Sequence, residues 1–217
     1  MIKLCVFDLD GTLLDTLDTV CEHINLALRE EGIAPISTFE CARLLGKSAG
    51  DMFVEILSAR GAFDLLRLQS LFRAYTRASS GDLVGHSKPF PGIRELLHQL
   101  QERGVRVGVL SNKRDESAKG LMYHFFPTVR YTKGYLEGER RKPDPEQLWK
   151  LISHFGCTRD EVLYIGDTEV DIETGKNAGV KTIAVSWGYR TEAALRSAGA
   201  SHVISLPEEI LTLLDEF

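Results

Sequence analysis

An apolar segment that ends in two closely spaced carboxylates sets the strongest limit on how this chain folds. Leu4–Phe7 are all apolar, which is typical of a strand buried in a parallel sheet. Asp8 and Asp10 follow at once, and unpaired carboxylates are costly in a core, so they should stand at the carboxyl end of that strand. Because side chains alternate along a strand, both can point to one spot, while Gly11-Thr12 turns the chain away.

The position of this acidic pair predicts a metal site. In open α/β sheets, ligands bind in the crevice beyond the carboxyl ends of the strands. Asp8 and Asp10 repel each other there unless a cation intervenes, and carboxylate oxygens suit a hard cation such as Mg²⁺. The alternative is a pair of solvated acids beside a glycine turn, since short motifs also recur by chance.

Composition and charge narrow the class of protein. The chain has 217 residues, of which 43% are hydrophobic and 26% charged, as in an ordinary globular protein. A net charge of −5 argues against a nucleic-acid partner. No apolar run approaches the ~20 residues that span a bilayer, and the first residues lead directly into a strand, so we expect a cytoplasmic protein without membrane contacts.

The pattern of elements predicts an α/β fold made of two domains. Residues from about 16 to 84 carry helical spacing without strand-like alternation. Strands and helices then alternate, which gives a parallel sheet covered by helices. The later strands are expected at Val105–Leu110, Val162–Ile165, Thr182–Val185 and His202–Ile204. We therefore predict a Rossmann-like, doubly wound core from residues 1–15 and 85–217, with an inserted helical domain at 16–84.

Four segments resemble the motifs of one enzyme family. The stretch from Asp8 to Asp15 resembles the first motif of the haloacid dehalogenase-like phosphohydrolases. Ser111-Asn112-Lys113 resembles the second motif, the segment around Lys142 the third, and Tyr164–Asp171 the fourth. They occur in the expected order along the chain. This resemblance extends over the whole chain, and it implies that the helical insert is a cap domain.

The resemblance also implies roles for particular residues. Ser111, Asn112 and Lys142 would bind the phosphoryl group, although a Ser-Asn pair is also common in plain turns. Asp167 would complete the metal site with Asp8 and the backbone carbonyl of Asp10. Asp171 would bind the metal through water or orient Lys142, or it is an ordinary acid in the first turn of a helix.

The implied activity is that of a Mg²⁺-dependent phosphatase, similar to the phosphoglycolate phosphatases of the family. Asp8 would attack phosphorus and form an aspartyl-phosphate, and Asp10 would act as general acid and base. Inorganic pyrophosphatase, 5′-nucleotidase and β-phosphoglucomutase-like phosphotransferase are alternatives with the same core motifs. A phospho-receiver signalling module is the non-enzyme alternative, but it leaves the helical insert without a purpose.

Substrate selection is expected to lie in the helical insert. Arg43 and Lys47, near a turn between its helices, would bind a second anionic group of the substrate. Exposed basic residues more often simply face water, which is the alternative. We expect a small-molecule phosphate as the partner and a monomer or weak homodimer.

Overall fold

The computed structural model describes residues 1–217, and the chain divides into two compact units. The core unit comprises Met1–Asp15 and Lys88–Phe217, and the helical unit comprises Thr16–Ser87. The chain leaves and re-enters the core unit through a short antiparallel pair, β2 (Leu14–Asp15) and β3 (Lys88–Pro89). The expected end of the insert at residue 84 therefore falls slightly before the division at Ser87.

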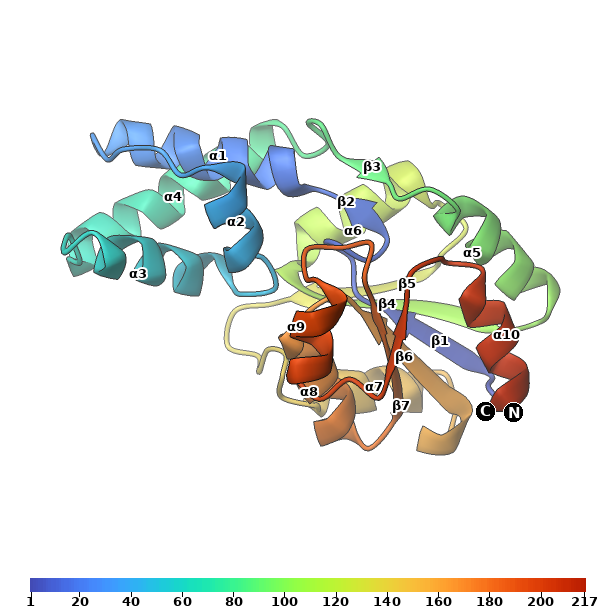
Figure 1. Cartoon of the computed structure of the whole chain (residues 1–217). Helices are drawn as coiled ribbons and strands as arrows, with labels where there is room; N and C mark the ends of the chain where they lie inside the picture. The colour runs from blue at the N-terminus through green and yellow to red at the C-terminus, as the bar shows by residue number, and fades with distance from the viewer. The chain divides into compact units, whose positions relative to one another are not determined.

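A six-stranded parallel sheet forms the centre of the core unit (Figure 1). Its order is β5-β4-β1-β6-β7-β8, so the chain runs outward from β1 first to one edge and then to the other. This is the arrangement of a doubly wound, Rossmann-like sheet, and it confirms the predicted fold class. The strands are β1 (Leu4–Phe7), β4 (Arg106–Arg114), β5 (Tyr131–Tyr135), β6 (Val162–Gly166), β7 (Lys181–Val185) and β8 (His202–Ile204).

Helices cover both faces of this sheet. All four residues of β1 have no solvent exposure, and because their side chains alternate, both faces must be covered at this strand. On one face, Leu4 and Val6 pack with Leu148 and Leu151 of α7. The helices of the core unit are α5 (Ile93–Glu102), α6 (Asp115–Phe125), α7 (Glu146–His154), α8 (Glu169–Ala178), α9 (Glu192–Ser197) and α10 (Glu209–Glu216).

The edge of the sheet differs from the sequence-based expectation. Strand β5 was not predicted, because its five residues include Lys133 and Gly134, which are depleted in strands, and lack the run of aliphatic residues that marked the other strands. A Cβ on Gly134 would crowd the backbone of Asp115, whose Oδ1 accepts a 3.0 Å hydrogen bond from the Gly134 N–H. This glycine therefore marks a close backbone approach. Strand β4 also continues past Leu110 to Arg114, with an irregular register over that stretch.

The helical unit contains four helices. They are α1 (Leu17–Glu30), α2 (Thr38–Leu44), α3 (Ala49–Ala59) and α4 (Leu65–Gly81). Helix α2 begins with a capping box, in which Ser37 and Glu40 satisfy each other's backbone N–H groups. None of the helices in the structure combines the length and the apolar character that crossing a lipid bilayer requires.

Candidate active site

Strand β1 delivers Asp8 to the carboxyl edge of the sheet. The N–H of Asp8 donates a 2.8 Å hydrogen bond to the carbonyl of Ile165, so parallel pairing with β6 continues to this residue. The chain then turns sharply, because the carbonyl of Leu9 accepts from the N–H groups of both Leu13 and Leu14 at 3.0 Å. Gly11 takes a φ of 87° in this turn, a conformation that favours glycine.

The neighbouring strand β6 delivers two further carboxylates. Asp167 directly follows Gly166, the last residue of β6, and Asp171 lies in the first turn of α8. Asp171 forms a capping box with Thr168 at the start of that helix. A Cβ on Gly166 would overlap the Asp171 carboxylate, so glycine at this position lets the carboxylate approach the strand end.

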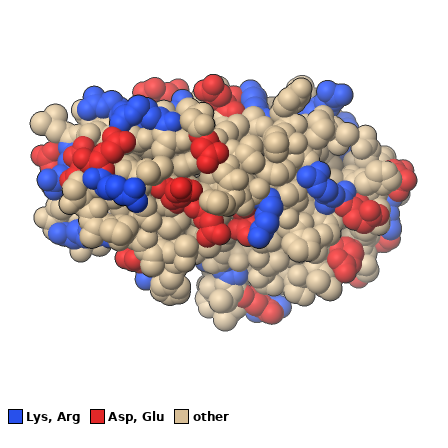
Figure 2. Space-filling model, turned by 90° about the horizontal axis from the view of Figure 1, so that it is seen from above, with Lys and Arg blue, Asp and Glu red and all other residues tan.

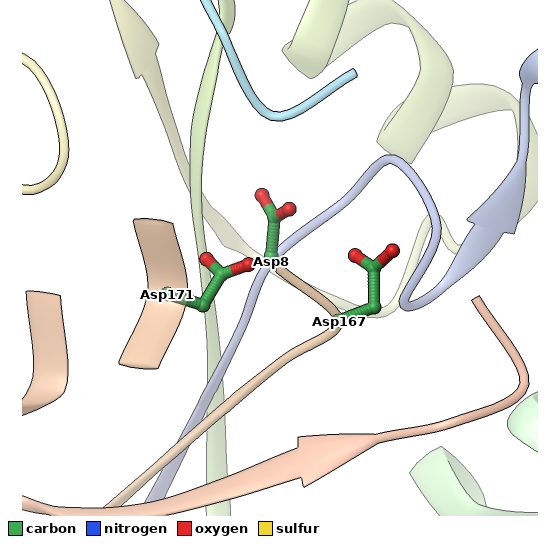
Figure 3. Close-up of side chains that lie close together, drawn as sticks. All are labelled: Asp8, Asp167 and Asp171. Carbon is green, nitrogen blue, oxygen red and sulfur yellow. The ribbon is translucent and has the colours of Figure 1, made fainter. Parts of the chain in front are cut away.

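Asp8, Asp167 and Asp171 converge on one buried cluster (Figure 3). One oxygen from each carboxylate lies within 4.8 Å of the others. The three residues are only 3%, 0% and 0% exposed, respectively. The structure therefore brings together three of the predicted metal-site residues from segments far apart in the chain.

Lys142 supplies the positive charge in this cluster. Its Nζ lies 2.8 Å from Oδ1 of Asp8 and 2.8 Å from Oδ1 of Asp171. Its backbone is held by Asn112, whose amide accepts from the Lys142 N–H at 3.0 Å and donates to the Lys142 carbonyl at 3.1 Å. Asn112 thus fixes the lysine's main chain, and its predicted contact with phosphate stays a prediction.

Four donors surround the Asp171 carboxylate. Oδ1 accepts from Lys142 and from the hydroxyl of Tyr164, the latter at 2.9 Å. Oδ2 accepts from the N–H of Thr168 at 3.1 Å and from its hydroxyl at 2.7 Å. A carboxylate satisfied in this way suits the predicted task of orienting Lys142 better than direct coordination of a metal.

Burial and charge together perturb the pKa values of these groups. Desolvation, opposed by Lys142, raises the pKa of Asp8 to about 7. Desolvation and the charges of Asp171 and Asp8 raise the pKa of Asp167 well above its usual range. Burial also acts to raise the pKa of Asp171. The charge of Lys142 and the hydrogen bonds from the other donors outweigh burial, so the pKa of Asp171 is lowered. Burial disfavours the charged form of Lys142, but the two carboxylates raise its pKa well above normal.

These perturbations indicate that the cluster suits a divalent cation. Three buried carboxylates lie beside one buried ammonium, so ionising all of them leaves uncompensated negative charge in a site that is largely shielded from solvent. The donors are all oxygens, which Mg²⁺ prefers. The residues present therefore fit the metal that the sequence predicted.

The second motif lies beside this cluster on strand β4. Ser111 is buried, and its Oγ accepts a 3.1 Å hydrogen bond from the N–H of Lys113. Lys113 extends its ammonium to Oδ1 of Asp10 at 2.9 Å, and both side chains are largely shielded from solvent. Sequence reasoning assigned no role to Lys113, although a residue two positions from Ser111 on a strand points to the same side.

The two predicted specificity residues belong to the helical unit. Arg43 is exposed in the last turn of α2. Lys47 follows that helix, and its ammonium pairs with Glu55 of α3. Their part in substrate binding stays a prediction.

Comparison with known proteins gives a consistent result. Residues 5–185 match the model of a family described as haloacid dehalogenase-like hydrolase. A phosphoglycolate phosphatase from Rhodospirillum rubrum is 32% identical over 202 residues, covering 88% of this chain and 83% of that protein. An N-acetylmuramic acid 6-phosphate phosphatase from Pseudomonas aeruginosa is 30% identical over 226 residues, covering 99% and 95%.

Solved structures show the same fold. A crystal structure of a protein from Lactobacillus delbrueckii subsp. bulgaricus superposes with a TM-score of 0.92 at 26% identity, covering 98% of both chains. A hydrolase from Pseudomonas syringae gives a TM-score of 0.82 at 23% identity, covering 100% of this chain and 99% of that one. At 23% identity, the likeness to the Pseudomonas syringae hydrolase shows a shared fold and nothing more.

Proposed function

Because this chain belongs to the haloacid dehalogenase-like hydrolase family and is a phosphatase of that family, we propose that it hydrolyses a small phosphomonoester of the phosphoglycolate type. The proposal includes Mg²⁺ as cofactor and an aspartyl-phosphate intermediate on Asp8. The observation that carries it is the bridge that Lys142 forms, at 2.8 Å each, between Asp8 and Asp171 within the buried carboxylate cluster.

Asp8 is the proposed nucleophile. A phosphate monoester is an anion, and two like unit charges ~4 Å apart repel by about 4 kcal/mol at an effective dielectric constant of 20. The ammonium of Lys142 beside Asp8 offsets part of that repulsion. An oxygen of Asp8 then forms a bond to phosphorus as the ester P–O bond breaks, which divides the hydrolysis into two easier steps.

Asp10 is the proposed general acid and base. It gives a proton to the departing alkoxide in the first step, and it takes a proton from the water that attacks phosphorus in the second. That attack breaks the bond between phosphorus and the Asp8 oxygen, which regenerates the carboxylate and releases inorganic phosphate. Asp10 follows Asp8 by two residues, and its carboxylate is held by Lys113.

The remaining groups would hold the metal ion or bind the phosphoryl oxygens. Asp8, the carbonyl of Asp10 and Asp167 would hold Mg²⁺, and Asp171 would bind it through water or orient Lys142. The bound ion would supply charge stabilisation for the phosphoryl oxygens. The hydroxyl of Ser111 and the ammonium of Lys142 would donate to the same oxygens. Asn112 supports this arrangement through the backbone of Lys142.

The substrate class rests on similarity and charge. Relatives of nearly equal identity carry the names of phosphatases for phosphoglycolate and for a sugar 6-phosphate, so identity alone does not choose between them. Arg43 and Lys47 are the residues proposed to favour a substrate with a second anionic group. The signalling-module alternative is set aside because the chain belongs to a hydrolase family.

Surface charge supports a small-molecule partner over a nucleic acid. Acidic and basic side chains are interspersed on the face shown in Figure 2, and the net charge is −5. We place the enzyme in the cytoplasm as a monomer or weak homodimer, without membrane contacts.

A substrate screen tests the proposal. Purified protein with Mg²⁺ would be assayed for phosphate release from phosphoglycolate, sugar phosphates, nucleoside monophosphates and pyrophosphate. We expect the highest kcat/KM for a small monoester that carries a carboxylate. Preferred release from pyrophosphate or a nucleotide would support the corresponding alternative, and interconversion of sugar phosphates without phosphate release would indicate a phosphotransferase.

A further inference from the structure

The segment that follows β7 makes close contacts with the candidate active site. Strand β7 pairs with β6 so that Ala184 lies opposite Gly166, which brings the chain after β7 alongside Asp167. The indole Nε1 of Trp187 donates a 3.0 Å hydrogen bond to the carbonyl of Thr12. The backbone N–H of Tyr189 donates a 2.8 Å hydrogen bond to Oδ2 of Asp167.

Gly188, between these two donors, allows the close approach. A Cβ at this position would overlap the carbonyl oxygen of Gly11 and the Cβ of Asp167. Gly11 lies in the turn after β1, and Asp167 follows the last residue of β6. Neither residue can move aside without disturbing the site. Glycine is therefore required here by space.

Asp167, Thr12 and the segment from Trp187 to Tyr189 are joined by a closed series of hydrogen bonds. Its Oδ2 accepts from Tyr189, and its Oδ1 accepts a 3.2 Å hydrogen bond from the hydroxyl of Thr12. The carbonyl of Thr12 in turn accepts from Trp187. Thr12 and Asp167 both have no solvent exposure, so water cannot replace these donors.

A bidentate ion pair anchors the far end of the segment. Nε and Nη2 of Arg190 lie 2.8 and 3.1 Å from the two carboxylate oxygens of Glu169, the first residue of α8. The segment is thus fixed both to the turn after β1 and to the helix that carries Asp171. This geometry gives it little freedom to drift away from Asp167.

We propose that Trp187 and Gly188 are positioning residues that set the direction of the Asp167 carboxylate for metal binding. Partners that orient a metal ligand commonly contribute tenfold or more to metal affinity. The inference rests on the Mg²⁺ site of the proposed function, and it adds residues that lie outside the four motifs.

The chain contains two tryptophans, which provide a matched pair of variants. Trp149 in α7 also donates its indole N–H to a backbone carbonyl, that of Ala178 at 3.1 Å. Ala178 is the last residue of α8, at the opposite end of that helix from Asp171. Mg²⁺ binding to Trp187→Phe, Trp149→Phe and wild-type protein would be measured by isothermal titration calorimetry without substrate. Thermal unfolding of each protein measures the structural cost separately.

We expect Trp187→Phe to weaken Mg²⁺ binding by about tenfold or more and Trp149→Phe to leave it unchanged. Gly188→Ala should weaken binding at least as much as Trp187→Phe. A dissociation constant for Trp187→Phe equal to that of the wild type would overturn the inference while leaving the proposed function in place. A wild-type protein that binds no Mg²⁺ would overturn both.

A second measurement leaves the segment unaltered. In Trp149→Phe, Trp187 is the only tryptophan, so its fluorescence reports on the segment directly. We expect Mg²⁺ to change that emission with a midpoint equal to the calorimetric dissociation constant. Emission that does not respond to a saturating Mg²⁺ concentration would contradict the proposed coupling even if the Trp187→Phe protein does not fold.

Discussion

The hydroxyl of Tyr164 donates a 2.9 Å hydrogen bond to Oδ1 of Asp171, the same oxygen that holds Lys142. Tyr164 lies in β6 with no solvent exposure, and its ring packs in the core against the helices on that face. One side chain thus belongs both to the hydrophobic core and to the candidate active site. Removing its hydroxyl should affect both.

For Tyr164→Phe, we expect a loss of about 1.5 kcal/mol in the free energy of unfolding, the lower end for a hydrogen bond to a charged group. The loss stays at that end because Asp171 keeps its other donors. Urea denaturation measures it, with the exposed Tyr123→Phe as a control. We also expect kcat/KM to fall by a few-fold, since Asp171 orients Lys142 less firmly; a variant with unchanged stability would show that this bond contributes nothing.

Asp8→Asn should abolish hydrolysis of p-nitrophenyl phosphate while the protein remains folded. The amide can still accept a hydrogen bond from Lys142, but it is too weak a nucleophile to attack phosphorus. Phosphate release and circular dichroism measure the two parts of this prediction. Asp160→Asn, at an exposed position, is the control. Wild-type turnover by Asp8→Asn would remove Asp8 from the nucleophile's role.

The stability of the metal-free protein should fall as pH rises from about 4 to about 7. An unfolded aspartate has a pKa of about 3.9, whereas that of Asp8 in the folded protein is raised to about 7. The folded state therefore binds the proton more tightly in this window, and its advantage is lost as pH passes through the folded pKa. Asp167 acts in the same direction. The pKa of Asp171 is lowered, so Asp171 affects stability only below about pH 4, outside this window.

Thermal unfolding at several pH values, with and without Mg²⁺, checks this dependence. The stabilisation by Mg²⁺ should grow as pH rises, because the ion displaces protons from the carboxylates. Asp8→Asn isolates the contribution of Asp8 and should show a shallower decline with pH. An equal decline in Asp8→Asn and wild-type protein would assign the dependence to other groups.

Removing divalent metal should stop turnover, and adding Mg²⁺ should restore it. After EDTA treatment, Lys142 still pairs with Asp8 and Asp171, but no metal offsets the charge of the three clustered carboxylates. The approach of a phosphate dianion then meets strong repulsion. Phosphate release with EDTA, and again after excess Mg²⁺, measures the effect. Undiminished turnover in EDTA would contradict the proposed metal site.

The sequence predicted those features that depend on local pattern. The apolar run before Asp8 placed that residue at the carboxyl end of a strand, and the structure has it there. That Asp10 points to the same spot stays a prediction. Asp167 was placed by its resemblance to the fourth motif. Lys142 was placed by its motif.

Contacts between distant segments could not be predicted in this way. Lys113 pairs with Asp10 across 103 positions, and Trp187 reaches Thr12 across 175. Tyr164 reads as one more apolar residue of a buried strand, although a buried phenol needs a hydrogen-bond partner. Such roles depend on which distant segments pack side by side. The local pattern of apolar and polar residues does not contain that information.

Lys47→Ala should raise KM more for phosphoglycolate than for p-nitrophenyl phosphate. The first substrate carries a carboxylate besides its phosphate, and the second carries only an uncharged nitro group at that distance. In the structure the ammonium of Lys47 is already paired with Glu55, so binding a substrate would require it to exchange partners. Losing the contact with Glu55 offsets part of the binding free energy that Lys47 gains from the substrate. We therefore expect the change in KM to differ between the two substrates by only a few-fold.

Lys150→Ala is a suitable control, because Lys150 also pairs with a glutamate but lies in α7 of the core unit. Equal changes in KM for the two substrates would show that Lys47 only faces solvent.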